Sequence, residues 1–134
     1  MIVRSLVEIS NTGRDVQTPN WRSRRIVLSN DGAGFSLHET VMRAGTVNDF
    51  QYVNHIEAVL VIEGDGKLID QDTGQTYDLT PGTMYLLNGH ERHRVVPETD
   101  IRAVCVFNPA LTGGEVHDDR GAYPILARGE RSIL

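Results

Sequence analysis

Three side chains in the middle of the chain have the chemistry of metal ligands: a carboxylate at Glu57, a phenol at Tyr85 and an imidazole at His93. Glu57 shares strand parity with Val59 and Val61, so we expect it on an apolar strand face, where an unpaired carboxylate is costly. Carboxylate, phenolate and imidazole together suit a divalent first-row metal. The same residues also have plainer interpretations, because Tyr85 could belong to the core and His93 could be a hydrogen-bonded or surface histidine.

The spacing around Glu57 supports the metal interpretation. Gly45, Gln51, Val53, Glu57 and Gly64 follow the spacing of the first cupin motif, in which positions 51 and 53 are usually histidine. Here both histidines are replaced and only the glutamate remains. Position 51 is therefore not expected to be an essential ligand.

The second cupin motif has a proline, a glycine and, three residues after the glycine, a histidine. In this chain Pro81 and Gly82 are followed by Tyr85 at that place, and His93 comes eight residues later. We expect each motif to form two strands joined by a turn. Closing such strands into a barrel points alternate side chains inward, so Glu57, Tyr85 and His93 are predicted to meet from three strands. Three protein ligands leave coordination positions open for substrate or water.

The elements that must position these residues have the pattern of short β-strands. Apolar runs separated by turn residues predict strands at 24–29, 35–45, 57–70, 76–79, 83–87, 93–96 and 101–107. No long stretch repeats with a helical period, so one short helical turn within 5–12 is the only helix expected. The predicted fold is all-β: a small, jelly-roll-like, cupin-type β-barrel with little helix, forming a single domain over 1–134.

Composition narrows the function classes. The chain has 134 residues and a net charge of −5, and its basic residues form no run that would favour nucleic-acid binding. No apolar stretch approaches the roughly 20 residues needed to cross a bilayer. Cys105 is the only cysteine and the N-terminus lacks a signal-peptide pattern, so we expect a cytoplasmic protein.

The chain resembles the ectoine synthases, a cupin family, from residue 1 to about residue 124. The segments that carry the resemblance are MIVR (1–4), GFSLHET (34–40), YVNHIEAV (52–59), IEGDG (62–66), PGTMY (81–85), HERH (90–93) and, most specific to the family, CVFNPALTGGEVHDDRGAYP (105–124). The resemblance implies cyclisation of N-γ-acetyl-2,4-diaminobutyrate to ectoine, an osmoprotective solute, with loss of water. It also implies iron, as Fe²⁺, on Glu57, Tyr85 and His93, and a head-to-tail homodimer.

The resemblance further implies a set of substrate-binding positions. They are Trp21, Arg25, Thr40, Tyr52, Cys105, Phe107, Glu115 and His117. Position 38, here His38, varies in the family and is left out of the set. The tail after residue 124 matches no family segment and is expected to cover the barrel mouth or fray from it.

Each position in this set suits a role. Glu115 and His117 point the same way on an extended segment, and with Tyr52 they form the predicted catalytic set, although a solvated acidic loop is the alternative for the first two. Arg25 has the planar fork that matches a substrate carboxylate, unless it forms a surface ion pair. Thr40 offers a second hydroxyl for orienting the substrate.

The remaining positions of the set shape the pocket. Trp21 and Phe107 would supply apolar walls that exclude water, although both could be plain core residues. Cys105 shares a strand face with Phe107, so it should line the same cavity, and nothing in the sequence indicates a nucleophilic thiol.

Two rival functions remain open at this stage. A different metal cupin, such as a dioxygenase, would usually carry two or three histidines with its glutamate, and this chain lacks histidine at positions 51, 53 and 85. A small-molecule-binding cupin, such as a sensor or storage protein, is the alternative that is not an enzyme.

Overall fold

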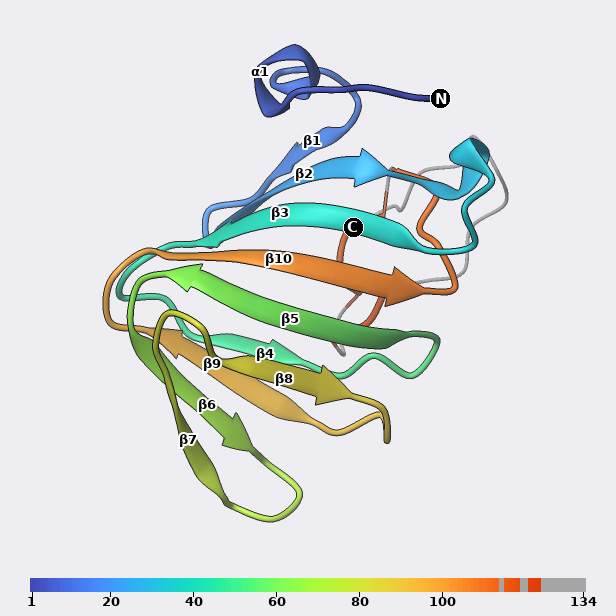
Figure 1. The fold of residues 1–134 in the computed structure, drawn as a ribbon. Helices are drawn as coiled ribbons and strands as arrows, with labels where there is room; N and C mark the ends of the chain where they lie inside the picture. The colour runs from blue at the N-terminus through green and yellow to red at the C-terminus, as the bar shows by residue number, and fades with distance from the viewer. Residues whose placement is uncertain (114, 119–120, 124–134) are drawn as a thin grey trace.

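Two antiparallel β-sheets face each other in the computed structural model, which describes residues 1–113, 115–118 and 121–123 (Figure 1). The larger sheet has the strand order β1-β2-β3-β10-β5-β8 and the smaller one the order β4-β9-β6-β7. The elements are α1 (Leu6–Ile9), β1 (Asp15–Gln17), β2 (Trp21–Val27), the 3-10 helix η1 (Ser29–Asp31), β3 (Ser36–Met42), β4 (Asn48–Phe50), β5 (Ile56–Glu63), β6 (Gly66–Asp70), β7 (Thr76–Leu79), β8 (Met84–Leu87), β9 (His93–Pro97) and β10 (Ile101–Asn108). The all-β cupin-type architecture predicted from the sequence is confirmed.

Most predicted strands are present, with two differences. The short strands β1 and β4 were not predicted, because three residues are too few to show an alternating pattern. The predicted run 57–70 divides into β5 and β6, which lie in different sheets. Gly64 marks the division: its φ is +93°, and a Cβ there would lie 2.1 Å from the carbonyl oxygen of Asp100.

The two strands of each cupin motif do not form a hairpin, so the hairpin expectation is wrong. β4 and β5 of the first motif lie in different sheets, and so do β8 and β9 of the second. Each motif therefore contributes one strand to either side of the space between the two sheets. Glu57 on β5 and Tyr85 on β8 come from the larger sheet, whereas His93 on β9 comes from the smaller one.

The core lies between the sheets, as strand parity predicted. Glu57, Val59 and Val61 are all buried along β5, and the residues from Ile101 to Phe107 are buried at every second position of β10. Alternation in the sequence therefore identified the inward faces of both strands.

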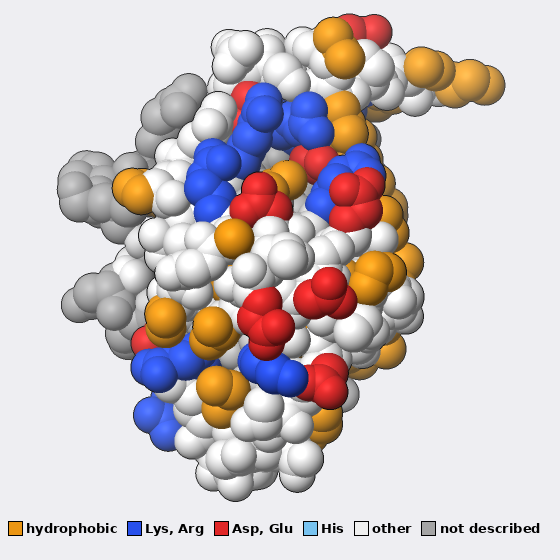
Figure 2. Space-filling view, turned by 90° about the vertical axis from the view of Figure 1, so that its left-hand side faces the viewer, with side chains coloured by type: hydrophobic (Ala, Val, Ile, Leu, Met, Phe, Trp, Pro, Cys, Tyr) orange, Lys and Arg blue, Asp and Glu red, His pale blue; other side chains and the backbone are white. Residues whose placement is uncertain are grey.

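The surface carries charges of both signs. Figure 2 shows basic side chains in the upper part of one face with acidic side chains among them. Arg24 and Arg102 both bind Glu39, at 2.9 and 2.7 Å, and Arg22 binds Asp15. In the described part of the chain, no helix has the length and apolar character needed to cross a membrane.

Candidate active site

A small cavity between the sheets holds most of the residues predicted from the sequence. Its volume is about 30 Å³, and it is lined by Trp21, His38, Thr40, Met42, Phe50, Tyr52, Glu57, Val59, Tyr85, His93, Cys105, Phe107, His117 and Tyr123. Of the predicted site residues, Arg25 and Glu115 are the two that do not line it. The structure therefore brings the predicted metal ligands and most predicted substrate contacts into one enclosed space.

Glu57 and Tyr85 reach the cavity from neighbouring strands. In the β5–β8 register Val59 is opposite Tyr85 and Glu57 is opposite Leu87, so the two polar side chains are diagonal neighbours on one face. Burial raises the pKa of Glu57 to about 8. Burial and the nearby Glu57 raise the pKa of the Tyr85 phenol well above its usual value.

His93 faces these two groups from the other sheet. Its Nδ1 lies 3.1 Å from the carbonyl oxygen of Glu91, and burial lowers the pKa of the imidazole. A neutral ring that donates from Nδ1 keeps a lone pair on Nε2, which is the form that binds a metal.

These three groups fit a divalent cation. No ion pair of Glu57 is found among the described residues, so without a cation burial keeps this carboxyl protonated near pH 7, and a bound cation would favour its charged form. The same part of the chain contains no group of three His, Cys, Asp or Glu side chains arranged to hold a metal. The candidate set differs from such groups because one of its three donors is the phenol of Tyr85.

Tyr52 and His117 form a hydrogen-bonded pair in the cavity wall. The Tyr52 hydroxyl lies 2.8 Å from Nε2 of His117. Burial, together with Arg25 and His93, lowers the pKa of His117 to about 3, so the ring is neutral near pH 7. Burial and Glu57 raise the pKa of Tyr52 well above its usual value, so its phenol keeps its proton. A neutral imidazole bonded to a phenol can pass a proton in either direction.

Arg25 is completely buried and has no carboxylate partner in the described part of the chain. Its Nη1 donates to the carbonyl oxygen of Gly113 at 3.1 Å, and its guanidinium lies 5.5 Å from the centre of the Tyr123 ring. Its Nη2 has no hydrogen-bond partner among the described residues. The surface ion pair considered as an alternative is therefore ruled out, and a buried cation of this kind favours an anionic ligand.

Glu115 has different surroundings from His117. Its carboxylate accepts hydrogen bonds from the amide nitrogens of Thr112 and Gly113, at 2.7 and 2.8 Å, and from the Thr112 hydroxyl at 3.0 Å. The structure therefore does not bring Glu115 and His117 together as a pair facing the cavity, as the extended-segment argument expected. Their segment forms no strand, so parity does not apply to it.

The apolar wall and the thiol lie where the sequence placed them. Trp21 packs edge-on against His117, with 5.2 Å between ring centres, and Phe107 packs edge-on against Tyr52 at the same distance. The Cys105 thiol donates to the Thr40 hydroxyl at 3.6 Å. Burial and Glu57 raise the pKa of the thiol well above its usual value, which agrees with its not being assigned as a nucleophile.

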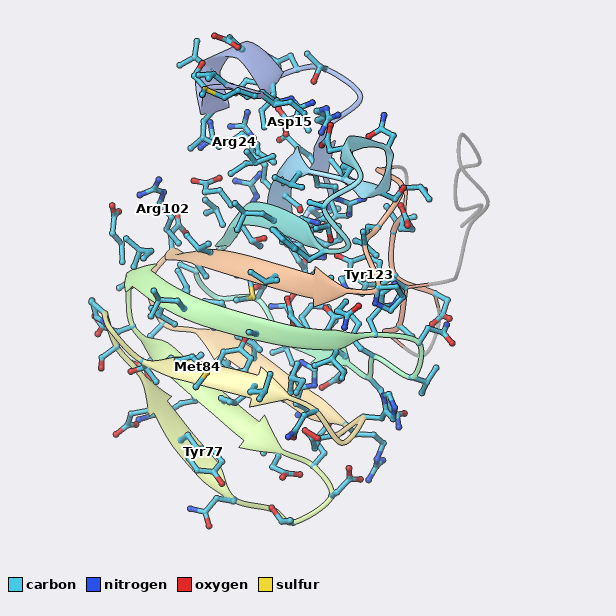
Figure 3. The ribbon with its side chains drawn as sticks, turned by 45° about the vertical axis from the view of Figure 1, so that its right-hand side comes forward. Asp15, Arg24, Tyr77, Met84, Arg102 and Tyr123 are labelled. Carbon is cyan, nitrogen blue, oxygen red and sulfur yellow. The ribbon has the colours of Figure 1, made fainter. Side chains whose placement is uncertain are left out.

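Five cavity residues were not among the predicted site residues: His38, Met42, Phe50, Val59 and Tyr123. Figure 3 shows Tyr123 beyond the end of β10, in the segment that follows the sheet. Its ring stacks on His117, with 4.2 Å between the ring centres. Tyr123 and Phe50 lie outside the predicted strands, so periodicity could not find them, although Tyr123 belongs to the family-specific segment at 105–124.

A larger pocket of about 260 Å³ lies on the other side of Tyr85 and His93, and its wall includes Leu68, Leu79 and Leu87. This pocket contains neither Tyr52 nor His117. Tyr52, His117 and the three predicted metal ligands all line the inner cavity, which is therefore the candidate active site.

Two facing antiparallel sheets with polar groups converging between them are arranged as in a cupin. A solved cupin domain from a transcriptional regulator of Enterobacter cloacae shares this fold at 14% identity, with a TM-score of 0.56 over 66% of this chain and 96% of the other. The family described as "Ectoine synthase" matches residues 1–127. The L-ectoine synthase of Saccharopolyspora erythraea is 58% identical over 130 residues, covering 97% of this chain and 96% of that protein. The crystal structure of ectoine synthase from P. lautus is 52% identical, with a TM-score of 0.85 over 95% of this chain and 91% of the other. The chain belongs to the ectoine synthase family.

Proposed function

We propose that this protein is an L-ectoine synthase, a carbon–oxygen lyase that closes N-γ-acetyl-L-2,4-diaminobutyrate into ectoine with release of water. The observation that carries the proposal is the family match over residues 1–127, which includes the residues that meet in the inner cavity. Relatives at 58–61% identity over nearly the whole chain are named for the same activity.

The reaction makes clear demands on the site. The free α-amine of the substrate attacks the carbonyl carbon of its own γ-acetamide, and a carbon–nitrogen bond forms. The former carbonyl oxygen then leaves as water, taking two hydrogens that were on the nitrogen. The site must fold the chain into a ring-like shape, take a proton from the nitrogen and deliver protons to the oxygen. Enforced folding alone can contribute several kcal/mol, because effective molarities of intramolecular reactions are large.

Tyr52 and His117 suit the proton transfers. A neutral His117 can accept the Tyr52 proton through their 2.8 Å hydrogen bond while the phenol oxygen receives a proton from the substrate nitrogen. The reverse transfer returns a proton to the departing oxygen. Near neutral pH the pair starts uncharged, and because the pKa of His117 is lowered to about 3, the ring holds the proton only transiently between the nitrogen and the departing oxygen.

Iron, as Fe²⁺, is part of the proposal, with Glu57, Tyr85 and His93 as its ligands. When bound, the metal would supply a Lewis acid for the amide carbonyl or a template for the folded substrate. The support is the chemistry of the three buried donors in one cavity, which other divalent metals could also use.

Arg25 and the aromatic walls suit the rest of the substrate. A buried guanidinium with a free N–H matches the substrate carboxylate. Trp21, Phe107 and Tyr123 would keep bulk water away from a reaction that releases water and can run backward.

A homodimer and a cytoplasmic location complete the proposal. The support for a dimer is a row of exposed apolar side chains on the outward positions of β5 and β8: Ile56, Leu60, Ile62, Met84 and Leu86. Contiguous exposed apolar area marks interaction surfaces. Cys105 is the only cysteine, which fits a reducing compartment.

The test is incubation of the purified, iron-loaded protein with N-γ-acetyl-2,4-diaminobutyrate, followed by mass spectrometry. We expect a product lighter by one water that co-elutes with ectoine. A dioxygenase would instead consume oxygen, and a binding protein would hold the compound unchanged. Either of these results would contradict the proposal.

A further inference from the structure

The pocket of about 260 Å³ beyond Tyr85 and His93, here called the outer pocket, shares a wall with the inner cavity. Tyr85 and His93 are the two described residues that line both spaces. Tyr77 on β7 and Met84 on β8 line the outer pocket at the exposed edges of the two sheets (Figure 3). Two of the three proposed metal ligands can therefore be reached from the surface through this pocket.

Two carboxylates line the outer pocket, Asp70 and Glu91, and no lysine or arginine does. Neither carboxylate forms an ion pair within the described part of the chain. Burial lowers the pKa of the His93 imidazole, and the charges of Glu91 and Asp70 oppose that shift, so both carboxylates lie close to the ring. The outer pocket therefore carries uncompensated negative charge beside a proposed metal ligand.

His93 also buries a nitrogen that lacks a partner. Its Nδ1 lies 3.1 Å from the carbonyl oxygen of Glu91, and a carbonyl can only accept, so Nδ1 carries the hydrogen of the neutral ring. The lone pair is then on Nε2, which has no hydrogen bond among the described residues. The side chain is only 2% exposed and lines the wall between the two spaces. A buried lone pair of this kind suits a metal ion.

The opposite approach to the inner cavity suits a cation less well. A surface pocket of about 350 Å³ adjoins the cavity there, and three aromatic side chains line both: Trp21, Phe50 and His117. Asp49 and Asp118 also line this pocket, but Asp49 is bound to Arg94 at 2.7 Å. Burial and the charge of Arg25 lower the pKa of His117, so a cation entering here would approach a guanidinium and would meet no proposed ligand first.

We propose that the outer pocket is the route by which the metal ion enters and leaves, with Asp70 and Glu91 attracting the hydrated cation and Tyr85 and His93 as the first ligands that it meets. The inference rests on the proposed function for the presence of a metal. A pocket lined by charge of one sign concentrates the opposite ion and raises its association rate. The aromatic side of the inner cavity is then left to the substrate.

The test measures metal uptake, with Co²⁺ as the probe and the full-length protein freed of metal by a chelator. Trp21 is the only tryptophan of the chain and lines the inner cavity, so its fluorescence should be quenched when Co²⁺ reaches the ligands. Glu57→Ala should show no saturable quenching. If the parent protein shows none either, the proposed metal site fails and the route fails with it. Saturable quenching in the parent protein leaves the route to be decided by the rates.

The two carboxylates are tested together in Asp70→Asn/Glu91→Gln. This variant should take up Co²⁺ about tenfold more slowly at low ionic strength, and the difference should shrink at about 0.5 M salt because salt screens the attraction. Glu98→Gln removes a charge from an exposed residue that lines no described pocket and should keep the parental rate. A parental rate in the double variant, or a loss that is equal at both salt concentrations, would overturn the role of the carboxylates.

The path itself is tested by narrowing it. Leu68 lines the outer pocket from β6, so Leu68→Phe should slow uptake and release alike, each about tenfold, and leave the Kd within about twofold. Ile69→Phe, which by alternation points to the other face of β6, is the matched control. If Leu68→Phe does not fold, Thr83→Phe narrows the same pocket. Parental rates in a folded narrowing variant would overturn the route, whether or not the protein cyclises its proposed substrate.

Discussion

Two parts of the cavity wall are built in different ways. Glu57, Tyr85 and His93 sit on strands whose registers are set by backbone hydrogen bonds on both sides of the interior. His117 and Tyr123 come after β10 and lie in none of the described strands; side-chain contacts and a few turn hydrogen bonds, such as the one from the amide of Asp118 to the carbonyl oxygen of Ala122, hold them in place.

This difference between the strands and the segment after β10 indicates which function each part of the cavity wall suits. A metal needs donors held within a few tenths of an ångström, and neighbouring strands provide that rigidity. Proton transfer and substrate entry tolerate, and often require, a wall that depends on a few hydrogen bonds. We therefore expect changes in the strand-borne part to abolish function and changes in the segment after β10 to have graded effects.

The largest effect on activity is expected from substitutions of the cavity residues on the strands. Glu57→Ala, Tyr85→Ala and His93→Ala should each lose the bound metal and reduce kcat/KM by about a thousandfold or more, because the metal would contribute several kcal/mol to the transition state. Metal content by mass spectrometry and steady-state kinetics measure this. Met84→Ala, on the outward side of β8, is the control and should keep its metal. Full metal content in all three variants would refute the ligand assignment.

Arg25→Met is expected to act on binding. It removes a buried charge that offers its free N–H to the substrate carboxylate, so KM should rise about a hundredfold. The metal content should not change, because Arg25 is not among the cavity-lining donors. A KM equal to that of the parent protein would remove Arg25 from the carboxylate site.

Tyr52→Phe tests the proposed proton transfer between Tyr52 and His117. The ring and its packing remain while the hydrogen bond to His117 is lost, so kcat should fall about a hundredfold with the metal retained. Thermal unfolding checks that the fold survives. If kcat stays at the parental value, the phenol does not carry the proton.

Metal affinity should depend on pH. A carboxyl must lose its proton before it binds a metal, and the pKa of Glu57 is about 8 in the protein without metal. Below pH 8 the metal has to displace that proton, and a phenolate ligand at Tyr85 releases a second one, so affinity should rise with pH by up to about tenfold per unit for each proton released. Chelator competition at pH 6, 7 and 8 measures the slope. Glu57→Gln should show a shallower slope, and an affinity independent of pH would contradict the assignment.

The smallest effect is expected from Glu115→Gln. An amide keeps one acceptor oxygen of a carboxylate that accepts three hydrogen bonds, so stability should fall by about 1 kcal/mol and kcat only a few-fold. Thr112→Val removes the hydrogen bond that the Thr112 hydroxyl donates to Glu115, and it should lower stability and kcat by similar amounts. A loss of kcat as large as that of Tyr52→Phe, without loss of stability, would restore Glu115 to the proton-carrying role predicted from the sequence.

The sequence by itself determined the strands and their inward faces. Alternation is a local property, so the burial of Glu57 with Val59 and of Cys105 with Phe107 could be predicted without knowing which strands pair. The motif spacing and the resemblance likewise identified the family and most of the cavity residues.

Only the tertiary structure decided how those strands were combined. A run of residues does not state which sheet it joins, because pairing depends on partners far away in the chain, and so the division of each motif between two sheets was missed. The same applies to the buried link from Ser23 to Arg25 and His38, and to the direction of Glu115. In these cases the decisive contact joins side chains whose closeness is a product of folding and not of sequence spacing.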